Sequence, residues 1–252
     1  LANTGAFEVG FHTSGALSIT GGGSVSGAGL MYVGYGMNRG TATVDITGGG
    51  SSLSAESLIL GRNSSWGSTA DISMNVSSGG SLTMSNTIWL TNSESKFLVP
   101  VLLNIGDYEL SSTGGTVSTP VLNFGKGGSG VLNFNQTDTV TFSTPIASPG
   151  VIPGGSGGPG TVNQRGTGTT IITGSNTYSG TTNITNGTFL ANNTNGSATG
   201  SSSVFVSGLG TLAGTGAISG PVTVQSGGTI HGTLGLGGPV TIHALGETDG
   251  DR

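Results

Sequence analysis

Acidic side chains are the first place to look for chemistry in this chain, because enzymes that cleave polysaccharides use paired carboxylates or carboxylates that hold calcium. Asp107 and Glu109 are two residues apart, so they would share one face of a strand, and they form the best acidic pair in the sequence. Asp45 has no acidic counterpart, because the repeat described below aligns it with Asn75. The sequence therefore predicts no catalytic residues.

Metal-binding and nucleophilic motifs are also absent from the sequence. The chain has no cysteine, and His231 and His243 lie twelve residues apart without further ligands nearby. Residues 21–24 and 48–51 read Gly-Gly-Gly-Ser and lack the aspartate that calcium-binding glycine-rich repeats require. We therefore expect neither a metal site nor a cofactor.

An internal repeat determines how the remaining side chains are placed. The run ITGGGS at 19–24 recurs at 46–51, an offset of 27, and more loosely at 76–81, a further offset of 30. A second run, MYVG at 31–34, aligns at the same two offsets with 58–61 and 88–91. Two independent matches at one offset indicate stacked coils, each of which buries its apolar edge against its neighbours.

Stacking converts these offsets into columns of neighbouring side chains. Alternation along a strand predicts that two of the columns face the core, namely Met31, Leu58, Ile88 and Val33, Leu60, Leu90. The residues between them, Tyr32, Ile59 and Trp89, then form an outward-facing apolar column. Two interpretations of this column remain open. Either a loop or a neighbouring protein covers it, or it is a surface that contacts a partner.

Two further columns contain polar and charged residues. The offsets place Tyr35 beside Arg62, and Arg39 beside Trp66 and then Lys96, so cation–π contacts can link successive coils. For this cation–aromatic turn column a stapled turn is favoured over a ligand site. Ser18, Asp45 and Asn75 are expected to form a hydrogen-bonded ladder rather than a catalytic group.

Composition limits the class of protein. Fifty-one glycines, 33% hydrophobic residues and only 7% charged residues favour a packed β structure over disorder. No helical period persists and no apolar run is long enough to span a membrane as a helix. A net charge of −5 with six basic residues leaves no positive surface for nucleic acid.

The second half of the chain resembles a known family. Two β-branched runs, 169–173 and 181–185, are separated by turns rich in glycine and asparagine, and the pattern continues through 203–216 and 222–230. Residues 160–232 resemble the autotransporter-associated β-strand repeat. That resemblance implies an all-β, right-handed parallel β-helix, with coils of roughly 20–30 residues as in other solenoids. It also implies export to the outer membrane, cell surface or medium of a Gram-negative-type bacterium.

The expected organisation follows from the repeats and from the residues that break them. We expect coils with repeat offsets of 27 to 30 over 1–144, a Gly/Pro-rich loop or linker over 145–160, family-type coils over 161–246 and a tail over 247–252. Because the chain begins at Leu1, without an initiator methionine or signal peptide, we expect it to be a piece of a longer precursor.

The functional prediction is a non-enzymatic surface passenger that acts as a stalk, an adhesin or a filament subunit. Its expected partners are other copies, joined end to end through open strand edges, and a surface glycan or a host or matrix ligand. The alternative is a carbohydrate-binding or polysaccharide-degrading β-helix that uses Tyr32, Trp66 and Trp89 as stacking platforms. Ice binding is remote, because it needs Thr-x-Thr pairs on successive coils, and the pairs 41/43 and 139/141 are not so placed.

Overall fold

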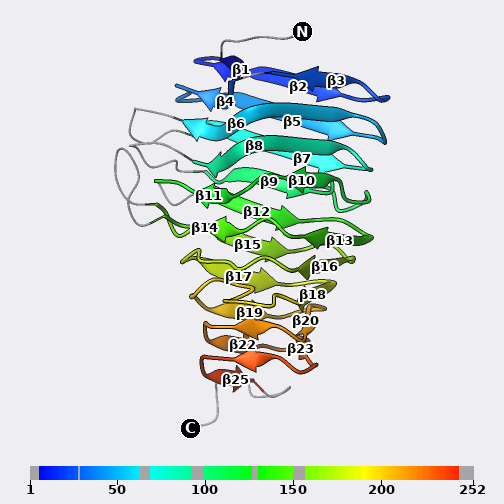
Figure 1. The fold of residues 1–252 in the computed structure, drawn as a ribbon, viewed down its shortest axis with the longest axis vertical. Coiled ribbons are helices and arrows are strands. Elements are labelled where there is room, and N and C mark those ends of the chain that lie inside the picture. Colours follow the sequence, from blue (N-terminus) through cyan, green and yellow to red (C-terminus); the bar gives the residue numbers. More distant parts are fainter. Residues whose placement is uncertain are drawn as a thin grey trace.

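The chain folds as a stack of parallel β-strands in which one coil lies on the next from the N-terminal to the C-terminal end (Figure 1). The computed structural model describes residues 6–27, 29–62, 69–91, 99–126, 130–149 and 157–243. Every strand in these ranges pairs in parallel with a strand of another coil. The prediction of a parallel β-solenoid without helices is confirmed for the described part of the chain.

Two long sheets form the sides of the N-terminal half. The first contains β1 (Phe7–Phe11), β4 (Leu30–Tyr35), β6 (Ser52–Arg62), β8 (Ser81–Leu90), β11 (Leu122–Phe124) and β14 (Ile146–Ala147), with β3 (Ser24–Ser26) and β10 (Thr116–Ser118) at its side. The second contains β2 (Gly15–Ile19), β5 (Thr41–Thr47), β7 (Asp71–Ser77), β9 (Val101–Ile105), β12 (Gly130–Phe134), β15 (Thr161–Gln164), β17 (Thr181–Ile184), β19 (Val204–Val206), β22 (Val222–Val224) and β25 (Val240–Ile242).

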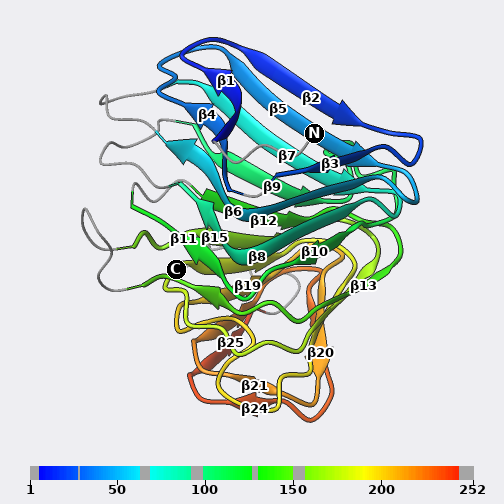
Figure 2. The same ribbon diagram turned by 45° about the horizontal axis from the view of Figure 1, so that its top comes forward.

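The C-terminal half adds two further faces to the second sheet. One is built from β13 (Thr139–Phe142), β16 (Thr169–Ile172), β18 (Thr188–Ala191), β20 (Thr211–Gly214) and β23 (Thr229–Ile230), and the other from β21 (Ala217–Ile218) and β24 (Gly235–Leu236). Figure 2, tilted towards the stack axis, shows these faces enclosing a common interior.

The coils become shorter along the stack, which narrows towards its C-terminal end in Figure 1. Near the N-terminal end Leu17 pairs with Val44, an offset of 27, whereas near the C-terminal end Val204 pairs with Val222, an offset of 18. In the second sheet, β12 pairs with β15, so hydrogen bonding continues past the Gly/Pro-rich segment 145–160. Residues 150–156 of that segment, and the tail at 247–252, lie outside the described residues.

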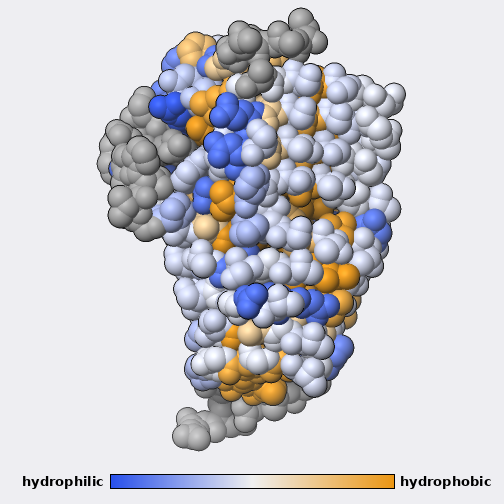
Figure 3. Space-filling view, viewed as in Figure 1, coloured by the Kyte–Doolittle hydropathy of each residue, from blue (hydrophilic) through white to orange (hydrophobic). Residues whose placement is uncertain are grey.

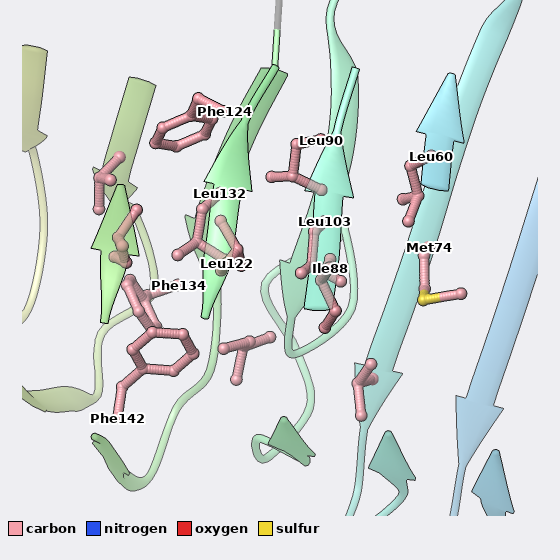
Figure 4. Close-up of a cluster of buried hydrophobic side chains, with 14 of the residues drawn as sticks. Leu60, Met74, Ile88, Leu90, Leu103, Leu122, Phe124, Leu132, Phe134 and Phe142 are labelled. Carbon is pink, nitrogen blue, oxygen red and sulfur yellow. The ribbon is translucent and has the colours of Figure 1, made fainter. Parts of the chain in front are cut away.

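The core is one continuous apolar cluster that runs from Val9 to Val224. Both predicted core columns belong to it, and each of their six side chains is at most 1% exposed. Figure 4 shows how apolar residues from the two long sheets, among them Leu60, Leu90 and Leu103, meet between the strands. The two columns continue into Leu122 and Phe124 of the next coil, so the predicted repeat extends into a fourth coil.

Candidate functional site

The outward column predicted from the repeat exists, but little of it reaches solvent. Tyr32 pairs with Ile59, and Ile59 with Trp89, in the register that the offsets predict. The exposed fraction is 8% for Tyr32 and 6% for Ile59, although neither belongs to the core cluster, and Trp89 is half-buried. Among these three residues, Trp89 therefore has the most surface left for a partner. Contact with a partner through this column stays a prediction.

Beside this column lies a group of aromatic side chains with one arginine. Phe11, Tyr35 and Arg62 occupy equivalent positions on three successive coils. The Phe11 and Tyr35 rings stack with 5.4 Å between centroids, and the Arg62 guanidinium carbon lies 5.3 Å from the centre of the Tyr35 ring. Arg62 and Tyr35 are thus placed for a cation–π contact between successive coils. We call Phe11, His12, Tyr32, Tyr35 and Arg62 the aromatic–arginine cluster.

Additional contacts hold this cluster in a defined geometry. Tyr32 stacks on Tyr35 with 4.9 Å between ring centroids, and Nη1 of Arg62 donates a 2.8 Å hydrogen bond to the Tyr32 hydroxyl. The His12 and Phe11 rings meet edge to face with 4.2 Å between centroids, and Nδ1 of His12 lies 3.0 Å from the carbonyl oxygen of Gly36. Phe11 remains 46% exposed and Arg62 is exposed, so the cluster joins an apolar surface to an accessible cation.

The backbone explains why these side chains gather. Gly10, Gly34 and Gly61 stand at equivalent positions just before Phe11, Tyr35 and Arg62, and all three have a positive φ. This left-handed conformation turns the end of each strand, and glycine adopts it without steric cost. Thr91 takes the same conformation on the next coil, with φ 65°. Glycine at these corners is what presents the cluster residues.

The aromatic–arginine cluster lies on a surface where apolar and charged side chains both occur. Figure 3 shows hydrophobic and strongly hydrophilic residues next to each other over the N-terminal coils, with further hydrophobic areas over the middle and lower coils. Of the remaining predicted turn residues, Arg39 is exposed, while Trp66 and Lys96 lie outside the described residues. Their pairing therefore stays a prediction.

A second feature is the polar ladder on the second sheet, which extends well beyond the predicted Ser18, Asp45 and Asn75. Register continues the column through Asn104, Asn133, Asn163 and Asn183. Each asparagine amide donates to the side-chain oxygen of the residue on the preceding coil, at distances of 2.6–2.9 Å, and Asp45 accepts at the N-terminal end. The amides satisfy one another, so this ladder stabilises the stack and offers no catalytic group.

A third feature is a threonine column on the face formed by β13 to β23. Register places Thr139, Thr169, Thr188, Thr211 and Thr229 at equivalent positions on five coils. The sequence indicates Thr188, Thr211 and Thr229, because each follows a glycine in a recurring Gly-Thr pair. Thr139 and Thr169 belong to the same column although their spacing differs. The neighbouring outward column contains Thr141, Ile171, Leu190 and Ala213, so Thr-x-Thr pairs do not repeat.

In the predicted acidic pair, Asp107 forms hydrogen bonds within its own loop. Both carboxylate oxygens of Asp107 accept hydrogen bonds from Ser111, and the Asp107 backbone N–H donates to the Ser112 hydroxyl. Burial raises the pKa of Asp107, but these hydrogen bonds outweigh it and hold the pKa below its usual value. Glu109 is exposed. No group of three His, Asp or Glu side chains that could hold a metal occurs among the described residues.

Comparison with known proteins supports the resemblance found in the sequence. The chain is 42% identical over 101 residues to the adhesin BmaC autotransporter of Brucella suis biovar 1 (strain 1330), and the match covers 40% of this chain and 3% of that protein. No family model and no solved structure matches the chain. The described ranges contain no helix long and apolar enough to cross a membrane. Together, the match and the parallel stack support the resemblance to autotransporter-associated, passenger-type proteins, which are secreted or displayed at the surface of Gram-negative bacteria.

Proposed function

We propose that this chain is a non-enzymatic segment of a surface adhesin, in which a stiff β-solenoid presents side-chain columns to a ligand outside the cell. The observation that carries the proposal is the uninterrupted stack from β2 to β25 around one apolar core. A rod of this kind can hold binding residues away from a bacterial surface. The named relative is an adhesin, which favours the same role here.

The adhesin role includes a stalk function, because a solenoid that separates a binding surface from the cell is also a spacer. We infer a right-handed coil, since connections between parallel strands of one sheet are right-handed in nearly all proteins. Pairing of the stack end with another copy would extend the rod into a filament, because a head-to-tail contact does not close on itself.

Attachment is the property that tests the proposal. Beads coated with the purified protein should attach to cultured epithelial cells or to immobilised matrix proteins more strongly than beads coated with albumin. Trp89→Ser should weaken attachment while changing the melting temperature little, because the side chain is half-buried and outside the core cluster. Attachment no better than that of albumin beads would count against an adhesin. A large loss of melting temperature in the variant would place Trp89 among the structural residues.

A polysaccharide-degrading role receives no support from the described side chains. Asp107 is engaged by Ser111 and Ser112, and Glu109 is exposed. Release of soluble sugar from pectin by the purified protein would nevertheless reverse this assignment. Loss of that release in Asp107→Asn would then locate the reacting group.

A further inference from the structure

The aromatic–arginine cluster combines two features that recognise different parts of one ligand. Phe11 is 46% exposed and rests on Tyr35, so an apolar ring face or edge is presented at a fixed position. Arg62 lies two coils further along the same column and is also exposed. Successive coils are about 4.8 Å apart, so the ring and the cation are separated by roughly 10 Å.

The contacts that Arg62 makes with the described residues leave its charge available to a ligand. Its contacts with described residues are the Tyr32 hydroxyl and the Tyr32 and Tyr35 rings, none of which neutralises a guanidinium. A guanidinium carries five N–H donors in a planar fork that fits a carboxylate. One of these donors is directed to Tyr32, so a carboxylate can still bind to others. The aromatic contacts hold the side chain in place, which reduces the entropy lost when a ligand binds.

We propose that Phe11, Tyr35 and Arg62 form a binding site for an anionic glycan, with a sugar carboxylate on Arg62 and the apolar face of a neighbouring sugar against Phe11. The spacing of two coils requires an oligosaccharide or a polymer rather than a single sugar. This assignment rests on the adhesin role proposed above and specifies its ligand. Because the whole chain has a net charge of −5, binding depends on this local cation rather than on overall attraction.

Polygalacturonate, a polymer in which each sugar carries a carboxylate, is the probe, and dextran is its neutral counterpart. With the full chain immobilised on a biosensor, polygalacturonate should bind and dextran should not. Binding should weaken as salt is raised, because the contact on Arg62 is exposed. Arg62→Met should weaken binding about tenfold or more, in line with the strength of a hydrogen bond to a charged group. Phe11→Ser should weaken it several-fold.

Two variants serve as matched controls. Arg165→Met removes the same charge from a similar arginine–aromatic contact, in which the Arg165 guanidinium carbon lies 5.2 Å from the Tyr108 ring centre, and it should leave binding within about twofold. Glu8 is exposed on the strand beside the cluster and in register with Tyr32, so Glu8→Gln should leave binding unchanged or make it tighter. Melting temperatures of all variants separate loss of binding from loss of folding.

Several results would overturn the site. One is that Arg62→Met binds polygalacturonate as tightly as the wild-type chain does. Another is that the wild-type chain does not bind polygalacturonate, and a third is that Phe11→Ser folds and binds it normally. Dextran sulfate that binds with the same dependence on Arg62 and none on Phe11 would indicate a simple charge contact. Bead attachment that persists when polygalacturonate does not bind rejects this ligand but keeps the adhesin role. Polygalacturonate binding without bead attachment rejects the adhesin role but keeps the site.

Discussion

At the scale of single residues, the interior of this protein contains polar groups whose partners come from other positions of the stack. Gln136 donates to the Thr170 hydroxyl at 2.8 Å, and Thr170 donates to Gln164 at 2.6 Å. The Tyr178 and Thr182 hydroxyls are joined by a 2.6 Å hydrogen bond. Buried polar groups need such partners, because an unpaired one costs about 1–3 kcal/mol. The solenoid is thus held together by polar contacts as well as by its apolar core.

Tyr178 should give the fold a sensitivity to alkaline pH. Burial raises the pKa of its phenol far above the usual value, and the hydrogen bond with Thr182 offsets this only in part. Because the folded-state pKa exceeds the unfolded one, stability is fully present below pH of about 10 and is lost progressively above it, by about 1.4 kcal/mol per pH unit. Urea unfolding at pH 9 to 11 should show this loss in the wild-type chain and less of it in Tyr178→Phe.

Tyr108→Phe is the control for this prediction, because Tyr108 is 53% exposed. That variant should keep the wild-type loss of stability at high pH. At neutral pH, Tyr178→Phe should cost roughly 1 kcal/mol, since the Thr182 hydroxyl loses its partner. Identical alkaline unfolding of the Tyr178→Phe and wild-type proteins would exclude this phenol as the source.

Asn104 is an interior member of the asparagine ladder and should be its most sensitive position. It is fully buried, donates to Asn75, and accepts from Asn133 and Asn135. Asn104→Ala should lower the free energy of unfolding by about 1–3 kcal/mol, because it leaves buried amides unpaired. Asn183→Ala, at the half-buried end of the ladder, should cost less. Equal losses for the two variants in urea unfolding would contradict a continuous ladder.

At the scale of elements, the strand ends depend on the column of left-handed corners. Gly34 has φ 75°, and a Cβ atom there would lie 2.4 Å from Cδ1 of buried Ile72. At this corner β4 therefore turns where a neighbouring coil leaves no room for a side chain. Thr91 adopts the same conformation with a side chain, and its hydroxyl donates to the Leu90 carbonyl at 2.6 Å.

Gly34→Ala should be clearly more destabilising than Gly21→Ala. Both glycines have a positive φ, which costs alanine roughly 1–2 kcal/mol, but a Cβ at Gly21 would meet nothing within 4 Å. The contact with Ile72 should add about 1–3 kcal/mol in Gly34→Ala. Thermal unfolding of the two variants measures the difference. Similar melting temperatures would show that conformation alone, and not packing, requires glycine at the corner.

At the scale of the whole molecule, the narrow end of the described stack presents apolar side chains. Val240 and Ile242 of β25 are 42% and 66% exposed, and β25 pairs only with β22 among the described strands. A further strand pairing on β25 would cover them, whether it comes from another copy or from more of the same polypeptide. Unpaired strand edges of this kind promote association.

Ile242→Lys should reduce end-to-end association of the purified chain, because a buried lysine at the joint would be unpaired. Leu209→Lys is the control, since Leu209 is 78% exposed in the turn before β20, away from the end strand. Sedimentation at increasing protein concentration should show larger species for the wild-type and Leu209→Lys proteins than for Ile242→Lys. A wild-type chain that remains monomeric throughout would contradict the filament role.

Much of the architecture could be predicted because the first coils have nearly equal lengths. With offsets of 27 and 30, the sequence places Met31, Leu58 and Ile88 in one column, and the structure has this register. The same offsets place Tyr35 beside Arg62. Phe11 precedes the residues aligned by the repeat, so its place on Tyr35 was not predicted. The asparagine ladder past Asn75 was missed for a related reason, since Asn104 and Asn133 lie in coils whose repeat is weak.

Three features could be predicted from the sequence: the class of fold, the core columns of the first three coils and the recurrence of Thr188, Thr211 and Thr229. These features depend on the alternation of side chains along a strand and on repeats that lie close together in the sequence. Three others depend on the folded stack: which outward columns reach solvent, which side chains form the aromatic–arginine cluster, and how Thr139 and Thr169 align with later threonines. The physical reason is that coils differ in length. Register between them is then set by backbone hydrogen bonds in the stack, and burial by neighbours far away in the sequence.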